Sequence, residues 1–507
     1  SISTTSGYGL QSSGGGTLTV SGTTNDLATT TGVPLSVLNT TIGAGDLNFR
    51  RISANGASQG IVLNNTGTAG GLKIGANLPG SSSVGDGGVL QNLTQNALSL
   101  TNTANVSLNY ARIQTTGSHA VMGAGVTDQS GGTEPSLEIR QCAILNAGNS
   151  DDENALHFVG NPGISGRLAV SNTSITSYFE NALEVGNSSG TLQIDITSCT
   201  INDNNDTFGG DAIYVASQAT AVVRLNLTNS SFDNTEGAIV QFQDTGSGNN
   251  DVNITGNTST HGGGPDLFPA GGGIILGESK TGGTLTFDIQ NNVITNLFGD
   301  GVVLVGKGNL EGRVGGPNAG DGNRISATGG DGVRVDMDQG AGTYTWNVLI
   351  QNNQFGAVAG STGIGDDGIQ VLNRDGRGTL NLTIDNNLIA NTVSEGIRIF
   401  TDEDLALGAG FPISRIRMAN NTFNNIGTVE AIYVLTRDTA DGCFHIAGNT
   451  GNGAGGSPDG SIALDQADTS ILRISQAGIA ALAASNNGAV VSTLGNITFN
   501  GSCTNPT

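Results

Sequence analysis

Two adjacent aspartates, Asp366 and Asp367, follow Gly365 and stand directly before the aliphatic segment "GIQVL". Paired carboxyl groups can act as an acid and a base when a bond to oxygen is cleaved. Arg398, in the later segment "GIRIF", is a candidate for the basic group with which a lyase abstracts a proton. These three residues are the candidates for catalysis. The competing interpretation is that they belong to a repeat that looks the same in every copy.

Two runs of acidic residues are the candidates for a metal site. They are Asp151-Asp152-Glu153 and Asp402-Glu403-Asp404, both in loops expected beside strands. Hard cations need several oxygen ligands, which such loops can bring together. The sequence therefore predicts no cofactor, with calcium (Ca2+) at one of these loops as the open alternative. The simpler interpretation is that both runs are solvated surface.

The segments that must position these residues share one template. Alternating aliphatic residues are followed by Asn and a further aliphatic residue, then by a loop, and then by an acid or Asn, a Gly or Ala, and a second alternating segment. Examples are "LTFDIQNNVITNLFGDGVVLV" (285–305) and "LNLTIDNNLIANTVSEGIRIF" (380–400). A period of two indicates β-strands. A coil of ~30 residues cannot bury its apolar side alone, so about a dozen stacked coils of parallel strands are expected.

Asp367 is one member of this repeat. It aligns with Asp211, Asp300, Asp331, Glu395, Glu430 and Asp459, and with Asn96, Asn154 and Asn181. The pattern "DG(I/V)xV" is therefore a repeat unit, which favours a structural role for Asp367.

A second recurring residue is an asparagine three positions before the first aliphatic anchor of the coil. A stacked column of asparagines can hydrogen-bond from coil to coil, and Asn tolerates the left-handed conformation of a sharp corner. The predicted ladder consists of Asn172, Asn229, Asn291, Asn352, Asn386 and Asn420.

With these repeats, the sequence resembles the right-handed parallel β-helix proteins, the pectate-lyase-like fold, over roughly residues 50 to 465. Within that fold it resembles the bacterial extracellular and surface repeat proteins rather than a lyase or polygalacturonase. The resemblance implies an all-β chain, a single right-handed parallel β-helix (β-solenoid). Gly365-Asp366-Asp367 resembles a polygalacturonase motif, but the Gly-His-Gly of those enzymes is absent from this sequence, and "RIR" at 415–417 is only a loose match to their last motif.

Four residues between inward aliphatic positions are expected to stack on one outer face: Arg334, Gln370, Arg398 and Tyr433. Extended glycans bind such faces through aromatic stacking and hydrogen bonds, so these residues are the candidate ligand face. An ordinary mixed surface is the alternative.

Three regions are expected along the chain: a cap or junction segment at 1–50, the parallel β-helix at 51–465, and a C-terminal cap at 466–507 with a short helix in "SQAGIAALAASNNG" and final strands. Cys443 and Cys503 both fall near the C-terminal end, where a disulfide would staple the last strands. Cys142 and Cys199 lie two coils apart, about 9.6 Å by strand spacing, beyond the ~7 Å reach of a disulfide. They are expected to be unpaired.

Composition limits the function. The net charge of −23 disfavours nucleic acid as a partner, and no apolar run approaches the ~20 residues of a membrane span. Glycine is 81 of 507 residues and aromatics are 4%, which is typical of a solenoid rather than an ordinary globular core. The sequence predicts an extracellular or cell-surface structural protein or adhesin that forms filaments by end-to-end self-association or joins other surface polymers, with glycans as further partners. A polysaccharide-active lyase or hydrolase is the alternative.

Overall fold

The structure is a computed structural model. It describes residues 1–503 except 77, 81, 129–133, 206–209, 261–271, 339–342, 358–361, 375–376, 403–410, 428–429, 452–459 and 502. The chain divides into two compact units, Ser1–Gln241 and Phe242–Thr507. Both are built almost wholly from parallel strands, so the predicted all-β solenoid is confirmed.

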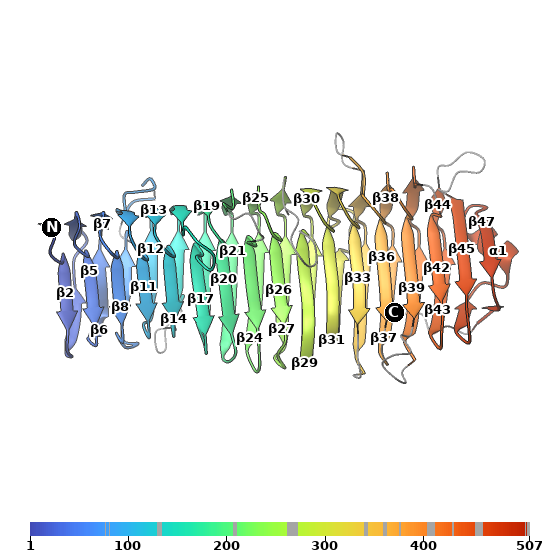
Figure 1. Ribbon diagram of the computed structural model, residues 1–507, viewed down its shortest axis with the longest axis horizontal. Helices are drawn as coiled ribbons and strands as arrows, with labels where there is room; N and C mark the ends of the chain where they lie inside the picture. Colours follow the sequence, from blue (N-terminus) through green and yellow to red (C-terminus); the bar gives the residue numbers. More distant parts are fainter. Residues whose placement is uncertain are drawn as a thin grey trace. The chain divides into compact units, whose positions relative to one another are not determined.

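Three columns of strands form the first unit (Figure 1). Each coil adds one strand to each column in turn, so a strand pairs in parallel with the strand three places later in the chain. The first column is β1 (Ile2–Thr4), β4 (Asp26–Thr29), β7 (Arg51–Asn55), β10 (Val89–Leu93), β13 (Arg112–Thr116), β16 (Ala143–Ala147), β19 (Ser174–Tyr178), β22 (Thr200–Asn202) and β25 (Ser231–Asp233). The second is β2 (Leu10–Ser13), β5 (Leu35–Leu38), β8 (Ile61–Asn64), β11 (Leu98–Thr101), β14 (Val121–Ala124), β17 (Leu156–Gly160), β20 (Leu183–Asn187) and β23 (Ile213–Ser217). The third is β3 (Thr17–Val20), β6 (Thr41–Phe49), β9 (Leu72–Ile74), β12 (Val106–Asn109), β15 (Leu137–Arg140), β18 (Gly166–Ser171), β21 (Thr191–Thr197) and β24 (Val222–Thr228).

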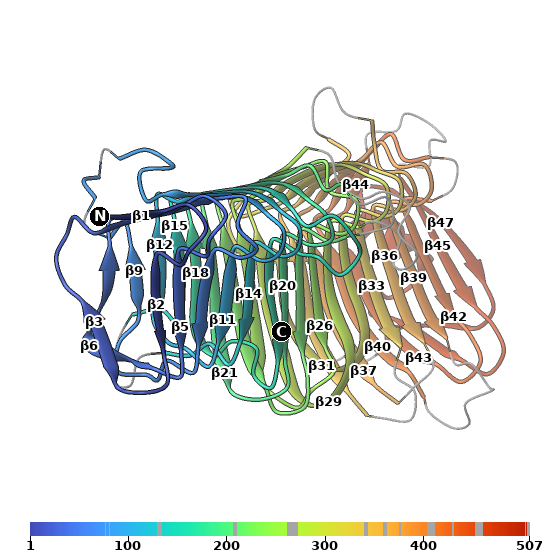
Figure 2. The same cartoon turned by 60° about the vertical axis from the view of Figure 1, so that its left-hand side comes forward.

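The second unit repeats this arrangement, with the second and third strands of two coils fused into the long strands β29 and β31 (Figure 2). Its first column is β28 (Thr258–Ser259), β30 (Val293–Leu297), β32 (Arg324–Thr328), β35 (Gln354–Phe355), β38 (Leu388–Ala390), β41 (Thr422–Asn424) and β44 (Thr450–Gly451). The second contains β26 (Val240–Asp244), β29 (Ile274–Gln290), β31 (Val302–Gly315), β33 (Val333–Asp338), β36 (Ile369–Arg374), β39 (Ile397–Asp402), β42 (Ile432–Thr436), β45 (Ser461–Gln466) and β47 (Val490–Leu494). The third contains β27 (Asn250–Thr255), the later parts of β29 and β31, β34 (Thr345–Gln351), β37 (Thr379–Asp385), β40 (Ile413–Ala419), β43 (Asp441–Ala447), β46 (Ile471–Ile474) and β48 (Ile497–Phe499).

Residues 1–50, set apart by the sequence as a cap or junction, already contain strands of all three columns. Strands β1 to β3 pair in parallel with β4 to β6. Near the other end, the helix expected within "SQAGIAALAASNNG" is α1 (Ile479–Ser485), which buries Leu482. Among the described residues, no helix combines the length and apolar character that crossing a bilayer requires.

The core consists of aliphatic side chains stacked on their counterparts in the next coil. Ile369 pairs in register with Ile397, and Ile397 with Ile432, and all three are buried. Arg398, between the inward Ile397 and Ile399, points outward. Burying an aliphatic side chain of this size stabilises a fold by about 1.5–3 kcal/mol. The period of two in the sequence therefore places aliphatic side chains in the interior and polar side chains on the exterior.

A ladder of buried asparagines runs through the second unit. In each step the main-chain N–H and the side-chain Nδ2 of one asparagine donate to Oδ1 of the next. Asn353 donates to Asn387 at 2.9 and 3.0 Å, and Asn387 to Asn421 at 3.0 Å for both bonds. Asn387 Nδ2 also donates to Ile350 O at 2.8 Å. The ladder consists of Asn257, Asn292, Asn323, Asn353, Asn387, Asn421, Asn449 and Asn486.

The predicted ladder was therefore placed one residue too early. The predicted residues Asn172, Asn229, Asn291, Asn352, Asn386 and Asn420 do adopt the expected left-handed conformation, with φ between 49° and 60°. That conformation turns the chain at the corner and leaves most of these side chains exposed, so the following residue points inward. Of the predicted set, Asn386 donates to Asn352 along the outside of the corner.

In the first unit the same inward position holds small residues instead of asparagine. Cys142, Thr173, Cys199 and Ser230 follow the corner residue in successive coils. The main-chain N–H of Cys142 donates to Thr173 Oγ1 at 3.3 Å, and that of Cys199 to Ser230 Oγ at 3.1 Å. Both cysteines are free and buried, as predicted.

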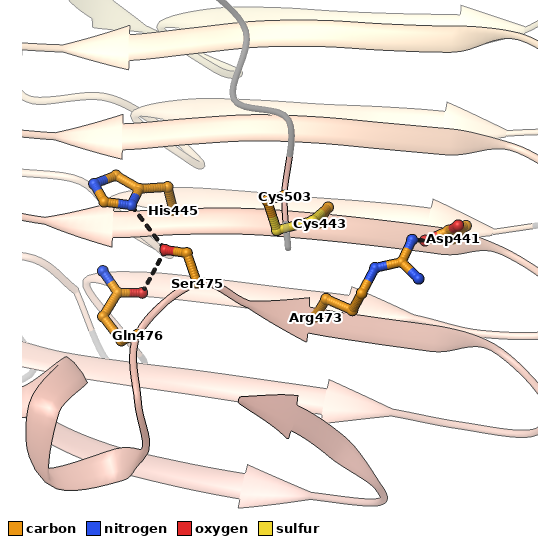
Figure 3. The surroundings of a disulfide bond; sticks show 7 residues. All are labelled: Asp441, Cys443, His445, Arg473, Ser475, Gln476 and Cys503. Atoms are coloured by element: carbon orange, nitrogen blue, oxygen red, sulfur yellow. Dashed lines mark hydrogen bonds and ion pairs between the residues drawn. A yellow bond between two sulfur atoms is a disulfide. The ribbon is translucent and has the colours of Figure 1, made fainter. Parts of the chain in front are cut away.

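Cys443 and Cys503 form the predicted disulfide, with their Cα atoms 5.7 Å apart (Figure 3). After β48 the chain turns back across β46, where the Gly501 N–H donates to Ile474 O at 3.2 Å. Cys503 then meets Cys443 on β43. The bridge fastens the chain end to a strand 60 residues earlier in the sequence.

We expect Asn387→Ala to lower the free energy of unfolding by roughly 3 kcal/mol or more, because each buried group left without a partner costs about 1–3 kcal/mol. The change removes the acceptor of Asn353 and the donor to Ile350 and Asn421. Guanidinium-induced unfolding measures the effect. The matched control is Asn386→Gly at the exposed corner, where glycine adopts a positive φ freely and we expect a change within about 0.5 kcal/mol. Equal effects of the two substitutions would contradict the ladder.

Candidate functional site

A column of buried and half-buried carboxyl groups precedes the second-column strands of the second unit. The main-chain N–H of Asp331 donates to Asp300 Oδ1 at 2.6 Å, that of Asp367 to Asp331 Oδ1 at 3.0 Å, and that of Glu395 to Asp367 Oδ1 at 2.9 Å. The repeat predicts this stacking, because all four residues occupy one template position. We call Asp300, Asp331, Asp367 and Glu395 the carboxylate column.

The same position in the first unit is filled by other acceptors. Asn154 donates its N–H to His119 Nδ1 at 2.9 Å, Asn181 donates to Asn154 Oδ1 at 2.8 Å, and Asp211 donates to Asn181 Oδ1 at 2.7 Å. The imidazole, amide and carboxylate groups therefore all accept a main-chain N–H from the next coil. Accepting the N–H of the next coil is a structural task, and Asp367 performs it like its counterparts.

One place in the carboxylate column is nevertheless distinctive. Asp366 adds a third carboxyl group, and oxygens of Asp331, Asp366 and Asp367 all lie within 4.8 Å of one another. The side chains of Asp331 and Asp367 are 3% and 0% exposed, whereas Asp366 is half-buried. Among the described residues, this is the one group of three acidic, His or Cys side chains close enough to hold a single metal ion.

Burial controls the protonation of this cluster. Loss of hydration, followed by the nearby carboxyls of Asp300 and Asp367, raises the pKa of Asp331 to about 8. Loss of hydration and a hydrogen bond with Glu395 raise the pKa of Asp367 to about 7. Loss of hydration also raises the pKa of Asp300. Near neutral pH, Asp331 and a share of Asp367 therefore hold protons that an exposed aspartate would have lost.

The predicted ligand face is brought together on neighbouring strands. Arg334 pairs in register with Gln370, Gln370 with Arg398, and Arg398 with Tyr433. Gln370 Nε2 donates to Asp367 Oδ2 at 3.2 Å, and Arg398 Nη1 lies 3.8 Å from the same oxygen. The face therefore lies directly against the carboxylate column.

Aromatic rings complete this face. The Arg398 guanidinium lies over the Phe400 ring, 4.4 Å from its centroid, and Phe400 meets Tyr433 edge-on at 5.8 Å. Tyr433 Oη donates to Asp465 Oδ2 at 3.1 Å. Loss of hydration and the neighbouring Asp465 raise the pKa of Tyr433 to about 12, so its hydroxyl keeps its proton.

The two acidic runs predicted as metal sites are arranged differently. Glu153 accepts the N–H groups of Asn149 and Ser150 at 2.6 and 3.0 Å, which closes a turn, while Asp151 and Asp152 are exposed. Within the described part of the chain, none of the three belongs to a group of three or more acidic, His or Cys side chains close enough to share one ion.

In the second run, Asp402 is paired with Arg437. Burial acts to raise the pKa of Asp402, but the hydrogen bond from Arg437 and its charge outweigh this and lower it. Glu403 and Asp404 lie outside the described residues.

The sequence interpretation missed a histidine pair in the first unit. The rings of His119 and His157 stack with centroids 4.4 Å apart, and His157 Nδ1 lies 2.6 Å from Glu184 Oε2. Burial and the neighbouring His157 lower the pKa of His119. The signal was present, because His119-Ala120-Val121 fits the template that places Asp367.

No family model, curated protein or solved structure matches this chain. A function for the chain is therefore inferred from the contacts described above.

We expect Asp367→Asn to change the pH dependence of stability. A carboxyl group whose pKa is higher in the folded chain stabilises the fold at pH values below its unfolded-state pKa. This stabilisation is lost as the pH rises through the folded-state pKa. For Asp367 the loss is expected between about pH 4 and about pH 7. Asparagine fills this position in other coils, so the variant should fold. The Tm of the wild type minus the Tm of Asp367→Asn should fall between pH 4.5 and pH 8. A difference that stays constant would contradict a raised pKa at Asp367.

Proposed function

We propose that this chain is an extracellular structural and adhesive β-solenoid with no chemistry of its own. The observation that carries the proposal is the repetition of the carboxylate column. The acid that a catalytic interpretation needs, Asp367, is buried and makes the same main-chain hydrogen bond as Asp331 and Glu395. A general acid has to reach the leaving group within hydrogen-bonding distance.

Its location outside the cell is supported by the disulfide between Cys443 and Cys503. Such bonds persist in oxidising compartments and are rare in the cytosol. The remaining described cysteines, Cys142 and Cys199, are buried, which protects them from oxidation and exchange. The acidic composition and the resemblance to bacterial surface β-helix proteins point the same way.

The proposed partners are other copies of the chain, joined end to end into filaments, or other surface polymers. Glycans are proposed as ligands of the face formed by Arg334, Gln370, Arg398 and Tyr433. Its planar guanidinium groups and its tyrosine ring suit hydroxyl-rich chains. Calcium is the cofactor proposed for the acidic groups.

Negative-stain electron microscopy of the native protein, with and without EDTA, tests the proposal. Filaments are the expected result for a structural subunit. Their loss in EDTA, and their return with added Ca2+ but not Mg2+, would assign the acidic groups to calcium. Separate particles in every condition would contradict the proposal that the chain assembles into filaments.

A polysaccharide-active enzyme is the second candidate, favoured by the cluster of Asp331, Asp366 and Asp367. Two raised pKa values beside a half-buried carboxyl are what an acid and base pair requires.

An activity assay separates the two candidates. The wild-type chain and Asp366→Asn are incubated with polyuronates and neutral glycans, and new reducing ends and unsaturated products are measured. The structural proposal expects the two proteins to give the same background. Product release by the wild type that falls at least about 100-fold in Asp366→Asn, the usual effect of losing an acid or base, would establish the enzyme.

A further inference from the structure

An ion pair is buried within the second unit, away from the carboxylate column. Lys280 lies in β29 and Asp244 ends β26, and Lys280 Nζ is 2.6 Å from Asp244 Oδ2. The two side chains are 3% and 0% exposed. Of the ion pairs in the described part of the chain, this is the one whose two side chains are both almost wholly buried.

Main-chain groups also contact the Lys280 ammonium and the Asp244 carboxylate. Lys280 Nζ also donates to Gly248 O at 2.7 Å. Asp244 Oδ1, the other oxygen of the carboxyl group, accepts the Gly246 N–H at 3.3 Å. The next coil leaves room for the lysine, because a Cβ on Gly308 would lie 2.3 Å from Lys280 Cβ.

A buried environment of this kind is more favourable for a neutral group than for two separate charges. Removing an ammonium and a carboxylate from water is unfavourable, and their attraction recovers the loss only when every other hydrogen-bonding atom is satisfied. An amide between the same side chains carries no charge and has one N–H and one C=O. Both already have partners in place: Gly248 O for the N–H and the Gly246 N–H for the C=O.

We propose that Lys280 and Asp244 are joined by an intramolecular amide bond in the mature protein. A proton first passes from the ammonium to Asp244 Oδ2, which leaves a neutral amine and a neutral carboxylic acid. The amine lone pair attacks Cγ, and the negative charge that develops on Oδ1 is stabilised by the Gly246 N–H. A second Nζ proton passes to the Oδ2 hydroxyl, which departs as water when the C–O bond breaks. The step needs no oxidant, cofactor or other reactant.

The ordered backbone holds the amine against the acid, which replaces a bimolecular encounter by a unimolecular one. The cross-link does not depend on the adhesive function proposed above. It would tie the end of β26 to the middle of β29, the longest strand of the unit.

Intact mass spectrometry of the purified full chain, unfolded and with its disulfide reduced, tests the proposal. We expect the wild type to be lighter than its sequence by the mass of one water molecule. Proteolytic mapping should then show the peptides that contain Asp244 and Lys280 as one branched species.

The matched control is Lys280→Arg, which keeps the positive charge but replaces the amine with a delocalised guanidinium that does not attack the acid. This variant should have its full sequence mass. A wild-type chain at full sequence mass would overturn the proposal. So would a water loss that persists in Lys280→Arg or that maps to an Asp-Gly pair, where ring closure within the backbone also releases water.

Discussion

In-register parallel stacking is the constraint on which the rest of this structure depends. Neighbouring coils are one strand spacing apart, about 4.8 Å, so most side chains lie directly on the counterpart in the next coil. An aliphatic residue meets this condition easily, because each of Ile369, Ile397 and Ile432 packs against the equivalent side chain in the next coil. A buried polar residue meets it only if it can hydrogen-bond to a copy of itself or to the backbone of the next coil.

The two polar columns of the second unit satisfy this condition in different ways. Asparagine has a donor and an acceptor in one side chain, so Asn353, Asn387 and Asn421 pair without a change of charge. An ionised carboxylate has acceptors alone. It takes the N–H of the next coil, but its neighbour is another acid, and one of the two keeps a proton. The raised pKa values of Asp331 and Asp367 therefore follow from stacking as well as from burial.

The sequence predicts the features that repeat, together with the terminal helix and the disulfide, and misses other contacts that occur once. The strands, the free cysteines and the alignment of Asp367 with Asp331 follow from the template. The ladder was placed one residue early because the doublets Asn352-Asn353 and Asn386-Asn387 offer two asparagines, and the pattern does not show which one takes the left-handed turn. Lys280 escaped notice because β29 runs through the position where other coils have a corner. Asp366 was found, but its distance from Asp331 depends on how two coils stack.

The asparagine ladder also bears on how such a chain changes its length over evolutionary time. Each rung donates to the rung after it and accepts from the rung before it, so duplicating or deleting a whole coil leaves no rung without a partner. Duplication of a coil within this stretch therefore preserves the hydrogen bonds of the ladder. The carboxylate column lacks this freedom, because each additional acid brings another proton or another charge into the same line. Coils that carry asparagine or histidine at that position, as in the first unit, are the ones that can be copied at the least energetic penalty.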